Sequence, residues 1–134
     1  AVLDTNIYIS ALLLPDSNPG KIIHLAISGY IEIIISPQML SELKNTLKRK
    51  FQYTENEAGD VIKELRYTAT VINPVHSVSG VCSKESDHRV LECAVSSGVN
   101  FLVSGDKKHL LSLKKYKNVE ILSPAEFLSR IIKF

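Results

Sequence analysis

The amino-acid sequence predicts an α/β fold, a three-layer α/β/α sandwich with a central parallel sheet. Short apolar, β-branched stretches alternate along the chain with longer stretches whose apolar residues recur every three or four positions. This alternation favours parallel strand pairing, right-handed crossovers and helices on both faces of the sheet. The 134 residues, 45% of them hydrophobic, suit one core, so we expect a single domain over residues 1–134.

The first part of the chain is predicted to form a strand, two helices and a second strand. A short buried strand at residues 1–3 precedes a helix at about 7–14, and residues 15–20 form a loop rich in Pro, Asn and Gly. A second helix fits residues 21–28. The β-branched run at residues 31–35 is typical of a strand.

Two helix starts in the middle of the chain carry capping signals. Ser36 can accept hydrogen bonds from the free N–H groups of a helix whose first turn holds Pro37. Thr54 and Glu57 form a capping box for the next helix, which reaches about Ala69. A short strand is then expected at residues 70–72.

The second half of the chain repeats the alternation. Apolar residues at positions 90–95 predict a helix that ends at Gly98, followed by a buried strand at 101–103. A short helix at 110–113 and a strand at 119–122 come next. Ser123 and Pro124 then open a last capped helix.

Composition excludes several classes of protein. The chain has 16 Lys+Arg against 14 Asp+Glu, and its net charge of +2 by itself indicates neither a nucleic-acid binder nor an enzyme for acidic substrates. It has no apolar run of the roughly 18 residues that a membrane span needs, and no signal-peptide pattern at its start. Two cysteines cannot form a disulfide framework. We therefore expect a reduced, cytoplasmic protein.

Four acidic residues are expected at one edge of the sheet. Asp4 follows the first strand, Asp106 follows the strand at 101–103, and Asp87 and Glu42 lie near the starts of their helices. In open α/β sheets ligands bind beyond the carboxyl ends of the strands. Carboxylates gathered there repel one another unless a cation neutralises them, and Mg²⁺ or Mn²⁺ is the natural oxygen-bound partner.

Simpler roles exist for each acid taken alone. Asp4 can be a helix cap, Asp87 a favourable acid at a helix start, Glu42 a solvated helix residue and Asp106 a turn residue. Their coincidence at one edge favours the metal site. No Cys/His spacing for zinc, Gly-x-Ser-x-Gly elbow or Gly-rich phosphate loop occurs. A haloacid-dehalogenase-type site is discounted because it needs a second Asp where this chain has Asn6.

The motifs around these acids resemble the PIN-domain family, and in particular the VapC-like toxin components of toxin–antitoxin pairs. The resemblance covers the chain from its start to its last helix. It rests on these stretches: Val2-Leu3-Asp4-Thr5-Asn6, Ser41-Glu42-Leu43, Asp87 with Val90-Leu91-Glu92-Cys93-Ala94, Phe101-Leu102-Val103-Ser104-Gly105-Asp106, and Ile121-Leu122-Ser123-Pro124-Ala125-Glu126-Phe127-Leu128.

The resemblance implies a Mg²⁺- or Mn²⁺-dependent endoribonuclease with a PIN-like fold, an antitoxin protein as partner, and a homodimer. Asp4, Glu42, Asp87 and Asp106 would be the catalytic, metal-binding set. Supporting positions match Thr5, Asn6 and Ser104, with Glu92 as a weaker candidate. One departure is Lys84-Glu85-Ser86 before Asp87, where relatives often carry more acids. That departure leaves open whether activity is retained.

The expected reaction is hydrolysis of an RNA phosphodiester by a metal-activated water. Basic residues near the acids are candidates for holding the RNA backbone, although solvated lysines are common on any helix surface. These candidates are Lys44, Lys48, Arg49, Lys107 and Lys108. The alternative is a PIN-like interaction module that has lost metal-dependent activity.

Overall fold

The computed structural model describes residues 1–82 and 84–132, and its centre is a six-stranded sheet. The strand order is β3-β2-β1-β4-β6-β5, with parallel pairing from β3 through β6 and β5 antiparallel to β6. The strands are β1 (Val2–Leu3), β2 (Ile34–Ile35), β3 (Thr70–Val71), β4 (Phe101–Val103), β5 (Lys115–Tyr116) and β6 (Val119–Leu122). The predicted α/β fold with a mostly parallel central sheet is confirmed, and β5 is an addition that the sequence did not predict.

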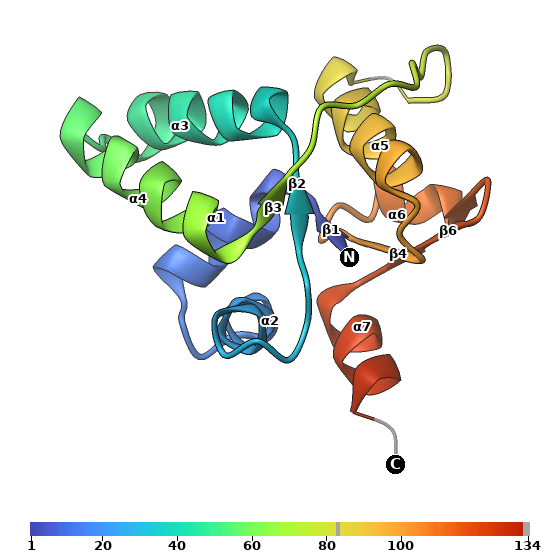
Figure 1. The fold of residues 1–134 in the computed structure, drawn as a ribbon, viewed down its shortest axis with the longest axis horizontal. Helices are drawn as coiled ribbons and strands as arrows, with labels where there is room; N and C mark the ends of the chain where they lie inside the picture. The colour runs from blue at the N-terminus through green and yellow to red at the C-terminus, as the bar shows by residue number, and fades with distance from the viewer. Residues whose placement is uncertain (83, 133–134) are drawn as a thin grey trace.

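Helices lie on both sides of the central strands (Figure 1). They are α1 (Thr5–Leu13), α2 (Asn18–Ile27), α3 (Pro37–Phe51), α4 (Glu55–Thr68), α5 (Glu85–Ser97), α6 (Leu110–Leu113) and α7 (Pro124–Ile131). In Figure 1, α1, α3 and α4 are left of β1 and β2, and α5 is right of them. Helix α5 packs on β1, β2 and β4, α1 packs on β1, and α7 packs on β4 and β6.

The predicted helix caps are confirmed. The Ser36 hydroxyl accepts a hydrogen bond from the Met39 N–H at 3.2 Å, which starts α3. Thr54 and Glu57 form both bonds of a capping box at the start of α4, at 2.9 and 3.1 Å. Ser123 caps α7 in the same way. These caps depend on residues only three positions apart, so they form independently of the tertiary fold.

The loop predicted at residues 15–20 is shorter than expected, because α2 begins at Asn18. The Ser17 hydroxyl accepts from the Gly20 N–H at 3.3 Å, so Ser17 is the cap. A Cβ on Gly20 would lie 2.0 Å from the Pro15 carbonyl oxygen, so this tight turn requires glycine. Similarly, β2 holds only Ile34–Ile35 of the predicted residues 31–35, and α1 begins at Thr5 instead of residue 7.

The core joins the sheet to the helices. Its fully buried side chains come from strands, such as Leu3 and Leu102, and from the inner faces of helices, such as Met39, Leu43 and Leu91. Burying these residues positions the strand ends and the starts of α3 and α5 relative to one another. Across residues 1–82 and 84–132, no helix has the length and apolar character needed to cross a membrane.

Candidate metal centre

The carboxyl ends of β1, β4 and β6 meet at one edge of the sheet. The Asp4 N–H, just after β1, donates to the Val103 carbonyl at 2.8 Å, and the Ser104 N–H, just after β4, donates to the Leu122 carbonyl at 3.0 Å. These bonds continue the parallel ladders past the strands. They place Asp4 and Ser104 side by side.

Asp4 is a buried carboxylate, 4% exposed, although it stands at the start of α1. Its Oδ2 accepts a hydrogen bond from the Ser104 hydroxyl at 2.9 Å. Burial raises the pKa of Asp4 to about 6, and the nearby charges of Asp87 and Glu42 add to the increase. The protein thus holds an acid where its ionised form is unfavourable unless a cation is present.

Asp87 lies in the first turn of α5 and is 5% exposed. Its Oδ2 is buried and has no hydrogen-bond partner among the described residues. Burial raises the pKa of Asp87, and the charge of Asp106 raises it further. Because a buried polar atom without a partner costs free energy, this oxygen is a natural place for a bound cation.

Asp106 is held by the loop that follows β4. Its Oδ1 accepts from the N–H groups of Lys108 and His109 at 3.2 and 3.3 Å, and its Oδ2 lies 2.7 Å from His109 Nδ1. Burial acts to raise the pKa of Asp106, but the hydrogen bond and charge of His109, helped by Lys108 and Lys84, lower it overall. Asp106 is therefore ionised and fixed in position.

Three ligand atoms, one each from Asp87, Asp106 and His109, lie within 4.8 Å of one another. The sequence predicted the two aspartates but not His109. The sequence signal that could have identified His109 is its spacing of three residues from Asp106. Asp106 is a turn residue and His109 precedes a short helix, so their side chains lie on the same side of a short loop. Oxygen donors with one unsatisfied buried oxygen fit a hard divalent cation.

Glu42 is half-buried on α3, and it lies outside the group of ligand atoms within 4.8 Å. Burial and the charge of Asp87 raise the pKa of Glu42, while Arg49, Lys50 and Lys84 oppose the increase. Asp4 also lies outside that group, but both residues interact electrostatically with Asp87. The four predicted acids therefore share one electrostatic environment, with Asp87 at its centre.

The predicted supporting residues differ in their surroundings. Ser104 is fully buried and links two acids, because its hydroxyl donates to Asp4 and accepts from the Asp106 N–H at 3.1 Å. Thr5 is buried, whereas Asn6 is exposed. Ser104 therefore holds two of the acids in position through its hydrogen bonds, whereas the exposed Asn6 has no such role in the part of the chain that the structure describes.

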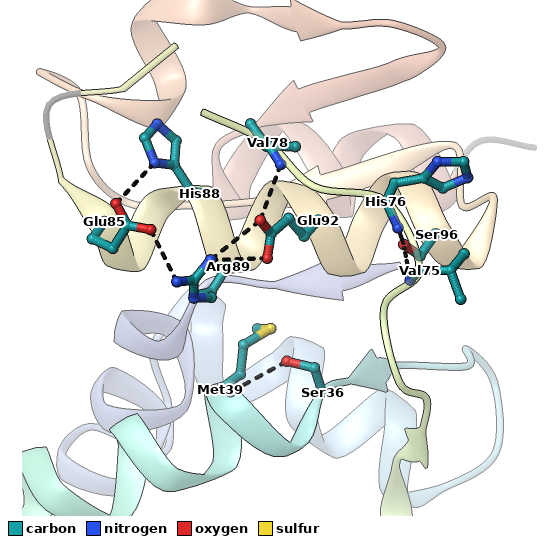
Figure 2. Close-up of polar contacts among 10 residues, drawn as sticks. All are labelled: Ser36, Met39, Val75, His76, Val78, Glu85, His88, Arg89, Glu92 and Ser96. Carbon is teal, nitrogen blue, oxygen red and sulfur yellow. Dashed lines mark hydrogen bonds and ion pairs between the residues drawn. The ribbon is translucent and has the colours of Figure 1, made fainter. Parts of the chain in front are cut away.

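Glu92 holds a backbone segment and lies outside the ligand cluster. Residues 73–82, which we call the strap, run along α5 (Figure 2). The Val78 N–H donates to Glu92 Oε2 at 3.0 Å, and the Arg89 guanidinium contacts both Glu92 oxygens. After Glu92 in α5, the Ser96 hydroxyl accepts from two strap N–H groups. Before Glu92 in the same helix, His88 Nε2 accepts from the Cys82 N–H at 3.0 Å.

The candidate RNA-binding residues fall into two groups. Lys44 and Lys48 both pair with Glu55 across the α3–α4 contact, so their charges are already partly neutralised. Lys107 and Lys108 are exposed and follow Asp106 directly, and Arg49 is exposed near the end of α3. A further cation, Lys84, lies 3.8 Å from Asp106 Oδ2. Basic side chains therefore lie near two of the acids: Lys84 is close to Asp106, and Arg49 and Lys50 of α3 act on Glu42.

Comparison with known proteins shows the family to which the chain belongs. A family model described as PIN domain matches residues 1–108. An uncharacterized protein of Methanocaldococcus jannaschii is 31% identical over an alignment that covers 99% of this chain and 92% of that protein. In fold, the chain is similar to a chain in the crystal structure of VapBC2 from Rickettsia felis bound to a DNA fragment from their promoter. That match has a TM-score of 0.64 and 14% identity, and it covers 91% of this chain and 96% of that chain. The chain belongs to the PIN-domain family.

Proposed function

We propose that this protein is a divalent-metal-dependent ribonuclease that hydrolyses phosphodiester bonds in RNA. The observation that carries the proposal is the closeness of Asp87 and Asp106 at the sheet edge, where a buried Asp87 oxygen has no partner among the described residues. The buried Asp4 is linked to Asp106 there through Ser104. Folding such a cluster is costly unless a cation is bound there. Membership in the PIN-domain family is consistent with nuclease chemistry at this edge.

Asp87 and Asp106 would hold Mg²⁺ or Mn²⁺, with Asp4 and Glu42 completing the acidic surroundings. When bound, the cation supplies activation of a water molecule and stabilises charge that develops on a phosphoryl oxygen. Ser104 orients Asp4 through its 2.9 Å hydrogen bond. Lys107 and Lys108, exposed beside the site, would hold the RNA backbone.

The test is a cleavage assay on structured and unstructured RNA with Mn²⁺, with Mg²⁺ and with EDTA. We expect metal-dependent cleavage that Asp4→Asn abolishes and that Asp60→Asn, at an exposed position of α4, leaves intact. A circular-dichroism spectrum of each variant checks the fold. Cleavage that persists in EDTA and in the Asp4→Asn variant would contradict the proposal.

We also propose that the chain is the toxin of a toxin–antitoxin pair and binds an antitoxin as a homodimer. Support comes from the fold similarity to a VapBC structure and from an apolar surface of the chain itself. Leu13 and Leu14, where α1 ends, and Ile27, the last residue of α2, are 51–65% exposed. Expression in a bacterial host should arrest growth for the wild type and not for Asp4→Asn. Light scattering of the purified protein should give twice the chain mass, and a monomer would exclude the homodimer.

The alternative is a PIN-like interaction module without metal-dependent activity. One observation favours it: the Lys84 ammonium lies 3.8 Å from Asp106 Oδ2 and offers that carboxylate a cation of its own. Lys84 is 54% exposed, however, so its side chain is able to move aside. If neither Mg²⁺ nor Mn²⁺ raises the melting temperature of the wild type or of Lys84→Ala, the module is the better description.

We further propose that residues 1–134 form one domain. The buried residues make one continuous core cluster that includes both β1 and α7 residues, such as Val2 and Phe127. A single cooperative urea transition, seen alike by circular dichroism and by tyrosine fluorescence, is expected. Two separate transitions would show two domains.

A further inference from the structure

We propose that His109 is a nitrogen ligand of the metal and that it biases the site toward Mn²⁺ over Mg²⁺. This inference rests on the proposed metal site and adds a residue and a selectivity to it. The starting observation is that a ring nitrogen of His109 lies within 4.8 Å of ligand atoms from both Asp87 and Asp106. The two carboxylates can each offer an electron pair to the same ion, and a neutral His109 ring can do so through the nitrogen that carries no proton.

The loop after β4 fixes the imidazole beside the acids. The His109 N–H donates to Asp106 Oδ1 at 3.3 Å, and the His109 carbonyl accepts from the Ser112 N–H at 3.2 Å. Leu110, the next residue, is fully buried. Because its backbone is held on both sides, the His109 ring stays against Asp106, with Nδ1 2.7 Å from Oδ2.

The unpartnered oxygen of Asp87 is an independent sign of a ligand here. Asp87 is 5% exposed, and its Oδ2 has no hydrogen-bond donor among the described residues. Ligand atoms on opposite sides of an octahedral ion lie about 4.2 Å apart, since each bond is about 2.1 Å. Ligand atoms that lie within 4.8 Å of one another can therefore meet one ion after side-chain movements of less than an ångström.

The identity of the donors sets the preferred ion. Mg²⁺ prefers oxygen ligands in near-ideal octahedral geometry and gives up its waters reluctantly. Imidazole nitrogen suits transition metals better. A site of two carboxylates and one imidazole should therefore bind Mn²⁺ more tightly than Mg²⁺. The other role for His109 is to orient Asp106 by hydrogen bonding without touching the ion.

His109 is the histidine best placed for this role. His88 lies next to Asp87 in sequence, but its Nε2 accepts from the Cys82 N–H at 3.0 Å. Its Nδ1 faces Glu85 at 3.4 Å. His24 is exposed on α2, so it provides a matched control position.

The test is pulsed electron paramagnetic resonance of the purified protein with Mn²⁺ alone. A directly bound imidazole gives a strong ¹⁴N modulation, which should change to a ¹⁵N pattern in wild-type protein labelled with [¹⁵N]histidine. His109→Gln should remove the modulation, whereas His24→Gln should retain it. Even if His109→Gln folds poorly, the labelled wild type shows whether any histidine binds the ion, and a spectrum without histidine modulation would overturn the role of His109.

Calorimetric titration gives a second readout. His109→Gln should weaken Mn²⁺ binding by about tenfold or more and leave Mg²⁺ binding within about threefold. Equal weakening of both ions, or no histidine modulation while Asp87→Asn still abolishes Mn²⁺ binding, would overturn the role of His109 and keep the metal site. No Mn²⁺ binding to the wild type at all would overturn both proposals.

Discussion

The buried carboxylate of Asp4 predicts an unusual dependence of stability on pH. The pKa of Asp4 rises from 3.8 to about 6 on folding, chiefly because the side chain is buried. Folding therefore disfavours the ionised form. The penalty is fully present above pH 6, shrinks as the pH falls through 6, and is absent below about 3.8. A difference of about 2 pKa units corresponds to about 3 kcal/mol, since one unit is worth about 1.4 kcal/mol.

Replacing Asp4 by asparagine removes the charge and keeps an oxygen for the Ser104 hydroxyl. In EDTA at pH 8, we expect Asp4→Asn to raise the free energy of unfolding by up to about 3 kcal/mol. At pH 4 the gain should fall below about 1 kcal/mol, because the wild-type carboxyl is then largely protonated. Urea unfolding at both pH values, followed by circular dichroism, measures the difference.

A matched control is Asp60→Asn on the exposed face of α4, which should change stability by less than about 0.5 kcal/mol at either pH. Mg²⁺ should stabilise the wild type at pH 8 and have less effect on Asp4→Asn. If Asp4→Asn is no more stable than the wild type at pH 8 in EDTA, the buried charge does not carry the cost assigned to it.

Three further outcomes are expected. Ser104→Ala removes the hydrogen bond to Asp4 and should lower the free energy of unfolding by about 1–3 kcal/mol; an unchanged urea midpoint would contradict this. Glu92→Ala should speed amide exchange at Val78, which loses its 3.0 Å acceptor, and unchanged exchange would show that the strap is held elsewhere. Glu55, whose pKa two lysines lower to about 2, stabilises the fold above pH 4.5 and loses this effect as the pH falls toward 2. Glu55→Gln should therefore lower the melting temperature at pH 6 and matter progressively less below pH 4.5.

Much of the fold could be predicted because its signals are local. The Ser36 and Thr54 caps depend on residues three positions apart, so the sequence alone specifies them. The start of α2 was missed because Pro19 and Gly20 usually mark a loop. Here Ser17 caps the helix, and Gly20 fits closely against Pro15. The edge strand β5 was missed because its two residues form a strand only through pairing with β6.

The sequence alone predicts which acids are candidates for the site, but it does not predict the residues that contact them. Strand ends can be located from apolar runs, so the sequence alone assigns Asp4 and Asp106 to one sheet edge. His109 could not be assigned in the same way. Its ring reaches Asp106 only because the loop after β4 turns back on itself through bonds to the Asp106 carboxylate. The pairing of Lys44 with Glu55 likewise depends on how α3 packs on α4.

The sequence by itself determined the alternation of strands and helices, the capped helix starts and the four acids near strand and helix ends. These depend on hydrophobic periodicity and on hydrogen bonds between near neighbours in the chain. Only the tertiary structure decided which acid is buried without a partner, which lysines are already paired, and that Glu92 holds the strap. Burial and long-range hydrogen bonds arise from packing between distant segments, and they set the pKa values of Asp4 and Asp87.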